Sequence, residues 1–440
     1  MWNLLKNAWK VKEVRSKLIF TFLMLVLIRF GSVLPIPGVN TAYFRNLLAS
    51  VSDTDAFGWF NAMTGGSFSD LSIFALSITP YITSSIIMQL LTIAIPQLEA
   101  IQKEGEEGRK KISEYTRYVT VGLALIESTA MAIGFGGSGL LYKYNFWSVI
   151  VCVVSMTAGS ALLMWIGERI TERGVGNGIS MVLLFNIISS LPDDLNSLFT
   201  RFIRYQTVAV GTLAAVIIIA CIAAMIMFVI VLNDATRNIP VQYTRKMQGR
   251  RMVGGSGSVI PLKVNTAGVI PVIFASSIMS LPVVIASFAG RVDYSTFGGR
   301  ILFMLNSGSW CNPAYPWASI GLVIYIVLVI LFAYFYTSIT FNPLEVANNM
   351  KKNGGFIPGI RPGKATSDFL QRILNYIIFI GAVGLIIVCL VPIIVSGVFG
   401  VGRLSFTGTS LMIIVAVIIE TMKQIESQLM VRNYKGFLND

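Results

Sequence analysis

Long apolar runs recur along the whole chain, and shorter segments rich in charged residues, glycine and proline separate them. Each run is close to the roughly 20 residues that a helix needs to cross a bilayer. The strands of a membrane β-barrel alternate in polarity and are about half as long. The pattern therefore predicts an all-α multi-span membrane protein. We expect about ten spans, near residues 18–36, 73–95, 117–136, 147–167, 178–192, 208–232, 267–289, 317–340, 373–396 and 405–422.

The second apolar run is interrupted. The stretch "GGSFSDLSIFAL" (65–76) directly precedes "SITPYITSSIIMQLL" (77–91), which has a proline near its start. The two stretches together are too long for one helix of ordinary span. Their serine, aspartate and proline residues also make a single continuous helix unfavourable. We therefore expect a shorter segment before the true second span.

The distribution of lysine and arginine predicts the orientation. With the amino terminus inside, the inside segments carry 26 of these residues and the outside segments carry 7. Because cytoplasmic loops are enriched in Lys and Arg, both termini are expected to be cytoplasmic. The first run follows a basic stretch, as a signal peptide would. It is nevertheless as long as a full span and is followed by no small-x-small cleavage site, so we interpret it as a retained span.

Ten spans divide into two sets of five. We expect an amino-terminal half over 18–192, an external linker over 193–207, a carboxy-terminal half over 208–422 and a cytoplasmic tail over 423–440. Because five is odd, the second half begins on the opposite side, so two halves of one fold would be inverted copies.

The first 17 residues are expected to lie on the cytoplasmic face of the membrane. In residues 1–17, Trp2, Leu5 and Trp9 recur at helical spacing, which indicates an amphipathic helix at the cytoplasmic interface. A disordered basic tail is the alternative.

The composition argues against an enzyme. Only 12% of the residues are charged, the mean hydropathy is +0.73 and there is no histidine. The usual general base, the usual metal ligand and the Ser-His and Cys-His pairs are therefore missing. The four cysteines form no C-x-x-C pair, so we expect no metal site and no cofactor. Ionisable residues within the spans are few: Arg29, Glu127, Glu168 and Glu420. Glu127 is the deepest of them, and a small-solute transporter would use such a residue for coupling.

Two predicted inside loops, 233–266 and 341–372, are long and basic. The second contains "FIPGIRPG", in which prolines and glycines surround Arg361. Proline restricts φ and glycine permits tight turns, so this frame would hold Arg361 at a defined tip. Docking of an acidic partner, such as RNA, an acidic protein groove or anionic lipid, would explain such a row of cations. A purely topological role of the charges is the alternative. The pieces "GFGGSGLL" and "GGSGSVIP" lack the Gly-Lys-Ser/Thr ending of a phosphate loop and are interpreted as flexible loops.

Several stretches together resemble one family. They are "IRFGSVLPIPGV", "SITPYITSSIIMQLLT", "EGEEGRKKISEYTRY", "TERGVGNGIS", "IPLKVNTAGVIPVIFASSI", "FIPGIRPG" and "GTSLMI". In this order, and over nearly the whole chain, they are similar to the SecY family, the channel subunits of the bacterial protein translocase. The bare loop tip "VGGSGSV" and the isolated Cys311 depart from the family pattern.

The resemblance implies a function and a set of partners. The chain is expected to be the central subunit of a protein-conducting channel in the bacterial cytoplasmic membrane. It would move unfolded secretory polypeptides across the membrane, and membrane proteins laterally into it. The expected partners are SecE, SecG, the SecA motor ATPase, the ribosome, signal peptides and membrane lipids. No cofactor is implied.

The resemblance also assigns residues. A re-entrant plug helix is expected over about 64–74, which we call the plug segment, and Phe68, Leu71 and Phe74 would seal it against a central pore. Such a helix of about 11 residues spans roughly 16 Å, too short to cross the membrane. The pore ring is expected at Ile78, Ile82, Leu183, Ile187, Ile273 and Ile413. Partner contacts are expected at Arg361, Arg250, Arg251 and Lys263. Polar contacts of a lateral gate between the second and seventh spans are expected at Gln89, Asn177 and Asn265.

Two other classes of function remain open on the residues alone. A secondary transporter of small solutes would also have inverted repeats and broken helices. A lipid-embedded scaffold would need no pore.

Overall fold

Each of the ten predicted spans coincides with a helix. The computed structural model describes residues 6, 8–51, 61, 64–204, 208–243, 246–248, 251–253, 257–289, 296–306, 309–311, 315–399 and 408–436. The ten helices are α2 (Lys12–Val33), α5 (Thr79–Ala94), α7 (Glu106–Phe135), α8 (Phe146–Arg173), α9 (Gly178–Phe199), α10 (Val208–Asp234), α11 (Ile270–Ala289), α13 (Ile320–Thr340), α15 (Lys364–Phe399) and α16 (Gly408–Gly436).

The protein is a mostly helical, multi-span membrane protein. Within the described residues, six helices are long and apolar enough to cross a bilayer, and a bent pair makes a seventh candidate. That pair is α5 and α6 (Pro96–Lys103), which meet at an angle of 101°. Pro96 begins α6, where its missing N–H costs least. Shorter apolar helices cover Gly178–Pro192 and Ile270–Val283. The full number of ten spans stays a prediction.

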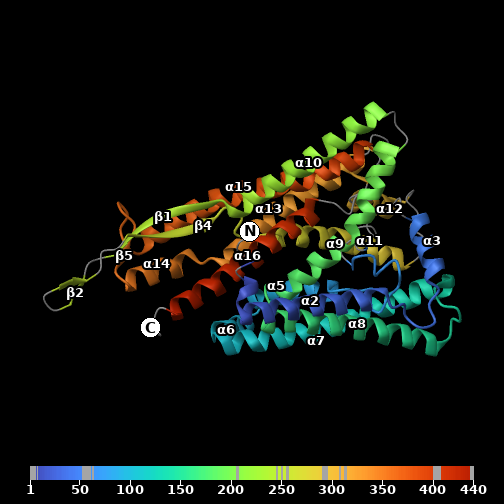
Figure 1. Cartoon of the computed structure of the whole chain (residues 1–440), viewed down its shortest axis with the longest axis horizontal. Coiled ribbons are helices and arrows are strands. Elements are labelled where there is room, and N and C mark those ends of the chain that lie inside the picture. The colour runs from blue at the N-terminus through green and yellow to red at the C-terminus, as the bar shows by residue number, and fades with distance from the viewer. Residues whose placement is uncertain are drawn as a thin grey trace.

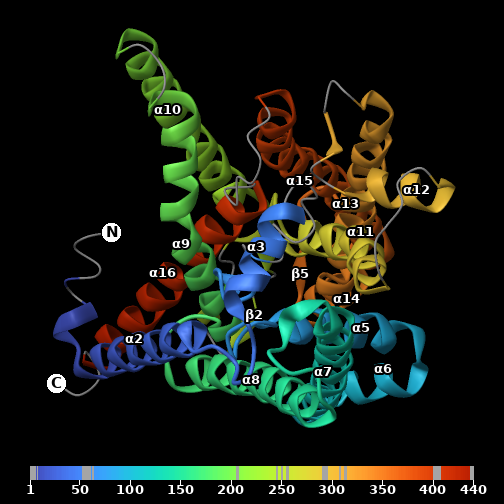
Figure 2. The ribbon, with the colours of Figure 1, turned by 90° about the vertical axis from the view of Figure 1, so that its right-hand side faces the viewer.

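The helices form two groups that face each other (Figure 2). One group contains α2, α5, α7 and α8, and the other contains α10, α11, α13 and α15. Helices α9 and α16 lie between the groups and contact each other. The long axis of the molecule runs from the strands and α14 at one end to α3 (Thr41–Val51) and α12 (Phe297–Leu305) at the other (Figure 1). We call these the hairpin end and the α3 end.

The hairpin end is built from the two long basic loops. The first loop folds into β1 (Thr236–Tyr243) and β4 (Gly257–Lys263), with β2 (Lys246–Gln248) and β3 (Arg251–Val253) beyond them. The second loop contributes α14 (Pro343–Lys352) and β5 (Gly355–Phe356). Strand order is β4-β1-β5, with antiparallel pairs such as Ile239–Ile260 and Gln242–Phe356. One apolar cluster joins the two loops, and it includes Ile239, Val241, Leu262, Met350, Ile357 and Leu370. The described parts of the two segments predicted as loops therefore pack together as one platform.

Several helix boundaries in the structure differ from those predicted from the sequence. Helix α2 begins at Lys12, so the first span helix includes the end of the predicted interfacial helix 1–17. Trp9 is exposed on the short helical turn before it, whereas Trp2 and Leu5 lie outside the described residues. The predicted linker 193–207 is helical as far as Arg204, because α9 continues past Pro192 into a π-helical turn, η2 (Thr200–Arg204). Apolar residues at helical spacing, such as Leu195 and Leu198, favour this continuation.

Close helix packing depends on glycine in α8. A Cβ at Gly159 would overlap the backbone carbonyl of Ile73. We expect Gly159→Ala to lower the free energy of unfolding by about 1–3 kcal/mol, the usual cost of overpacking. Gly122→Ala on α7 is the matched control, because no heavy atom lies within 4 Å of its added Cβ. Thermal unfolding in detergent measures both variants. Equal melting temperatures for Gly159→Ala and the wild type would contradict this packing.

Candidate functional site

Five of the six predicted pore-ring residues meet where the two groups of helices face each other. Leu183 and Ile187 of α9 and Ile413 of α16 are buried in one cluster, and Ile82 of α5 and Ile273 of α11 pack against it. We call this set the central cluster. Leu184, Val417, Met181, Val269 and Ile414 complete it. Four helices that are far apart in the sequence thus contribute to it.

Ile78, the sixth predicted ring residue, lies in the neighbouring cluster. It is 1% exposed and packs with Ile28, Leu163 and Val182. Ile82, one turn further along α5, contacts both clusters. Ile78 caps the amino end of α5, and its cluster includes residues of α2, α8 and α9.

The chemistry of the central cluster is uniformly apolar. Its members are aliphatic or methionine side chains, and the Met181 sulfur is a weak acceptor that takes a hydrogen bond from the Thr421 hydroxyl over 3.6 Å. A narrow apolar constriction expels water and so resists ions. It can also yield around a passing chain, because it makes no directional bonds with that chain.

The plug segment is not a helix. Between Gly65 and Ile78 the chain runs through successive turns, with positive φ at Gly65, Gly66, Leu71 and Ser77. The expected helix over 64–74 is therefore wrong for the described residues beyond Thr64. The physical reason is pairing with the end of the first span. Ile36 N–H donates to the Leu71 carbonyl over 3.0 Å, and Ile73 N–H donates to the Leu34 carbonyl over 3.0 Å. Such a bridge cannot coexist with helical bonding of the same groups.

The predicted sealing residues of the plug segment pack away from the central cluster. Phe68 and Leu71 are buried with Phe44, Leu140 and Met131, and the rings of Phe44 and Phe68 meet edge to face at 5.3 Å. Phe74 packs with Ile28 in the cluster that also holds Ile78. Their sealing of a pore stays a prediction, because no contact of theirs with the central cluster is found among the described residues. In this structure they anchor the plug segment to α2, α3, α7 and α8.

The backbone of the plug segment reaches α9 beside the central cluster. A Cβ at Gly65 would lie only 2.9 Å from the Cα and the carbonyl oxygen of Asn186, the residue before Ile187. The φ of Gly65 is +64°, which also favours glycine. Arg29 donates from Nη1 to the Gly65 carbonyl over 3.3 Å. Arg29, one of the few ionisable residues within the predicted spans, therefore contacts the plug segment.

An ion pair also holds the plug segment at the α3 end. Arg45 of α3 lies 2.7 Å from a carboxylate oxygen of Asp70. The Arg45 side chain is well exposed, so the contribution of this ion pair to stability is on the order of 0–1 kcal/mol. Within the segment, the Thr64 hydroxyl accepts from Phe68 N–H over 3.3 Å.

The three predicted polar residues of the gate do not meet. Asn177 accepts from the N–H groups of Ile179 and Ser180 at the start of α9, as a helix cap does. Asn265 donates to Asn233 over 2.8 Å, within the carboxy-terminal group. Gln89 is half-buried on α5.

Apolar packing joins α5 to the other group instead. Ile86 packs against the cluster that contains Val272 and Met279 of α11. Two of the three polar assignments thus have local structural roles.

The predicted partner-binding cations lie at the hairpin end. Arg361 is exposed on a turn between Gly359 and Gly363, whose φ values are +81° and +109°. Ile357 and Ile360 anchor this turn in the cluster beneath the sheet. Lys263 is exposed at the end of β4. Arg250 lies outside the described residues, and the structure describes only the backbone of Arg251, in β3. The frame predicted from glycine and proline is present.

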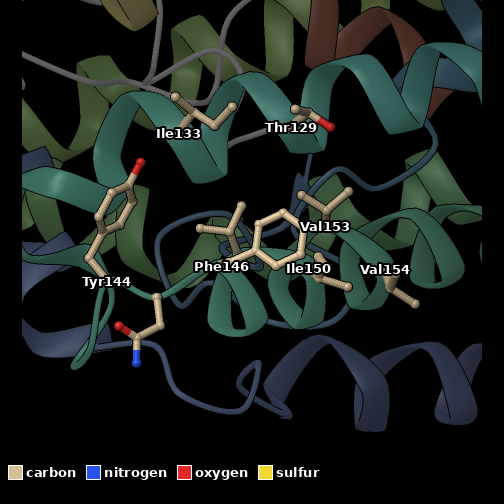
Figure 3. Close-up of a pocket in the computed structure, with 9 residues that line it drawn as sticks. Thr129, Ile133, Tyr144, Phe146, Ile150, Val153 and Val154 are labelled. Carbon is tan, nitrogen blue, oxygen red and sulfur yellow. The ribbon is translucent and has the colours of Figure 1, made fainter.

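Three further features concern whether the described residues could bind a hydrated solute or a metal ion. A groove between α7 and the start of α8 is lined mainly by aliphatic and aromatic side chains, among them Ile133, Phe146 and Val153 (Figure 3). Such a lining suits hydrocarbon rather than a hydrated solute. In the interior of α7, Glu127 has a buried Oε2 without a hydrogen-bond partner among the described residues. In the described part of the chain, no group of potential ligands could hold a metal ion.

Sequence reasoning missed Ser77 and Asn186. The Asn186 side chain donates from Nδ2 to the Ser77 hydroxyl over 2.9 Å, and both residues are buried. An asparagine within an otherwise apolar span was the available signal.

Solved structures share this arrangement. One described as the structure of a protein conducting channel has a TM-score of 0.62 at 19% identity and covers 94% of this chain and 92% of its own. Sec61 in a canine ribosome-channel complex from the endoplasmic reticulum has a TM-score of 0.56 at 18% identity, with coverage of 94% and 92%. The chain thus has the fold of a protein-conducting channel.

Sequence comparison is more specific. A model of the SecY family matches residues 72–422. The protein translocase subunit SecY of Streptomyces scabiei is 42% identical over 445 residues, covering 98% of both chains. That of Halalkalibacterium halodurans is 40% identical over 444 residues, covering 100% of both chains. The chain belongs to the SecY family. It is therefore a protein-conducting channel subunit and not an enzyme, and the alternatives of a small-solute transporter and a scaffold fall away.

Proposed function

We propose that this chain forms the conduit of a bacterial translocase, with the central cluster as its constriction. The observation that carries the proposal is that α5, α9, α11 and α16 contribute aliphatic side chains to one cluster between two groups of helices. Unfolded polypeptide would pass between these groups while the aliphatic side chains close around it. Contacts that form no bonds let a chain of any sequence slide past.

The lateral opening is proposed between α5 and α11. A signal segment that separates these helices would replace the packing of Ile86 against α11 with its own apolar contacts to both helices. Each buried CH₂ of that segment contributes about 0.8 kcal/mol, so roughly ten apolar residues suffice to offset the separation. Since Asn177 and Asn265 bond locally, this proposal rests on apolar contact rather than on a polar network across the gate.

The hairpin end is proposed to face the cytoplasm, together with both termini. The excess of lysine and arginine in the two long loops supports this orientation. SecA or a translating ribosome would dock on this platform, and SecE and SecG would accompany the chain in the membrane. Two observations support these partners. The relatives are named translocase subunits. Two structurally similar channels, canine Sec61 and the yeast Ssh1 complex, were solved with a ribosome.

Cysteine crosslinking tests the conduit. In a variant whose four native cysteines are replaced by serine, we expect single cysteines at Ile82 and Ile273 to crosslink a stalled secretory chain. A cysteine at Leu213, which is 62% exposed on α10, is the control for contact with the lipid-facing surface. Crosslinking through Leu213 but not through Ile82 or Ile273 would refute the proposed path.

A further inference from the structure

Contacts of Ser77 and Asn186 join four segments of the chain. The Ser77 hydroxyl accepts from Asn186 of α9 over 2.9 Å, and the Ser77 carbonyl accepts from the Ser160 hydroxyl of α8 over 3.1 Å. Ser77 is also the last residue before the cap of α5. Gly65 of the plug segment lies directly against the backbone of Asn186. Asn186, the neighbour of Ile187 in the central cluster, thus contacts both Ser77 and Gly65.

The backbone at Ser77 explains why these contacts matter. Its φ is +52°, a conformation that serine seldom adopts. Such a conformation persists only where the surroundings hold it, and it is often found at switch positions. Ser77 and Asn186 are 2% and 6% exposed, so their polar groups have little access to water. A buried polar group that loses its partner is costly, so the two side chains hold each other in place.

We propose that Asn186 is a positioning residue for the closed state, which couples the plug segment and the start of α5 to the central cluster. The Asn186 side chain holds Ser77, which directly precedes Ile78 and the first turn of α5 that carries Ile82. The Asn186 backbone packs against Gly65. Displacement of the plug segment therefore removes the packing on one side of Asn186. This inference rests on the proposed conduit, and it adds a polar element to a constriction described so far as purely apolar.

Replacing Asn186 by leucine tests the coupling. We expect the ion conductance of the purified Asn186→Leu protein in vesicles to rise about threefold to tenfold, the range that loss of one buried hydrogen bond gives to a two-state equilibrium. Export of a substrate with a defective signal sequence should rise in parallel. Asn196→Leu, at an exposed position of the same helix, is the matched control and should change neither readout.

An exchange of partners separates positioning from general stability. Asparagine tolerates positive φ better than most residues, so Ser77→Asn is compatible with the backbone there. Combined with Asn186→Ser, it restores a serine–asparagine pair in reversed order. We expect the double variant to return conductance and signal selectivity toward wild type, whereas each single variant leaks. Leakage in the double variant equal to that of Asn186→Leu, at wild-type membrane levels of protein, would overturn the inference.

A reference variant distinguishes this inference from the proposed function. Ile413→Asn perturbs the central cluster without touching the Ser77 contact. If Ile413→Asn leaks and Asn186→Leu does not, the conduit stands and the role of Asn186 is refuted. If neither variant leaks, the proposed constriction itself is wrong, and the inference falls with it.

Discussion

Ile413→Asn is expected to loosen the constriction. Ile413 is 2% exposed in the central cluster, and an amide there would be buried among aliphatic side chains. Burying an amide without partners costs about 1–3 kcal/mol, which destabilises the closed arrangement relative to a hydrated, open one. The equilibrium should shift roughly tenfold to a hundredfold toward the open state. Ion conductance of reconstituted vesicles and export of substrates with defective signal sequences measure the change.

Two controls accompany the Ile413 variant. Ile413→Leu keeps an aliphatic side chain of the same size and should behave as the wild type. Ile418→Asn changes a residue of the same helix that is 39% exposed, so it tests for a general effect of asparagine in α16. If Ile418→Asn leaks as much as Ile413→Asn, the central cluster is not the constriction.

Arg361→Glu is expected to abolish export driven by a cytoplasmic partner while the protein remains folded and inserted. Arg361 is exposed on the turn between Gly359 and Gly363 at the hairpin end, so its side chain is available to an acidic surface. Loss of a charged contact at an interface costs about 2–5 kcal/mol, and reversal of the charge adds repulsion. Export in a reconstituted translocation reaction, and binding of SecA or ribosomes to vesicles, are the measurements.

Lys352→Glu is the matched control for Arg361. It makes the same change of charge at an exposed position at the end of α14, close to the same loop. We expect it to reduce export far less than Arg361→Glu does. Failure of Arg361→Glu to accumulate in the membrane would show that the turn has a structural role instead.

Local patterns predicted the helices and the turn at Arg361. The apolar runs located a helix at each of the ten expected positions, because the bilayer requires helices of nearly constant length and composition. Gly359 and Gly363 predicted the turn, since proline and glycine act on their own backbone.

The plug segment and the gate show where sequence reasoning failed. Phe68, Leu71 and Phe74 have helical spacing, yet pairing with residues 34–36 replaced the helix by turns. Asn265 found its partner in Asn233, 32 residues earlier, rather than across the gate. Competing hydrogen bonds with distant segments leave no trace in the local sequence. Neither helical spacing nor a family resemblance could therefore locate these contacts.

The sequence by itself determined that this protein lies in a membrane, roughly where its helices run, which family it resembles and which aliphatic residues are available for a constriction. Only the tertiary structure decided that Ile82, Leu183, Ile187, Ile273 and Ile413 share one cluster, and that Ile78 belongs to the next. It also decided that Asn186 meets Ser77 beside Gly65. The physical reason is that hydropathy acts residue by residue, whereas which faces of four helices meet depends on packing summed over the whole fold.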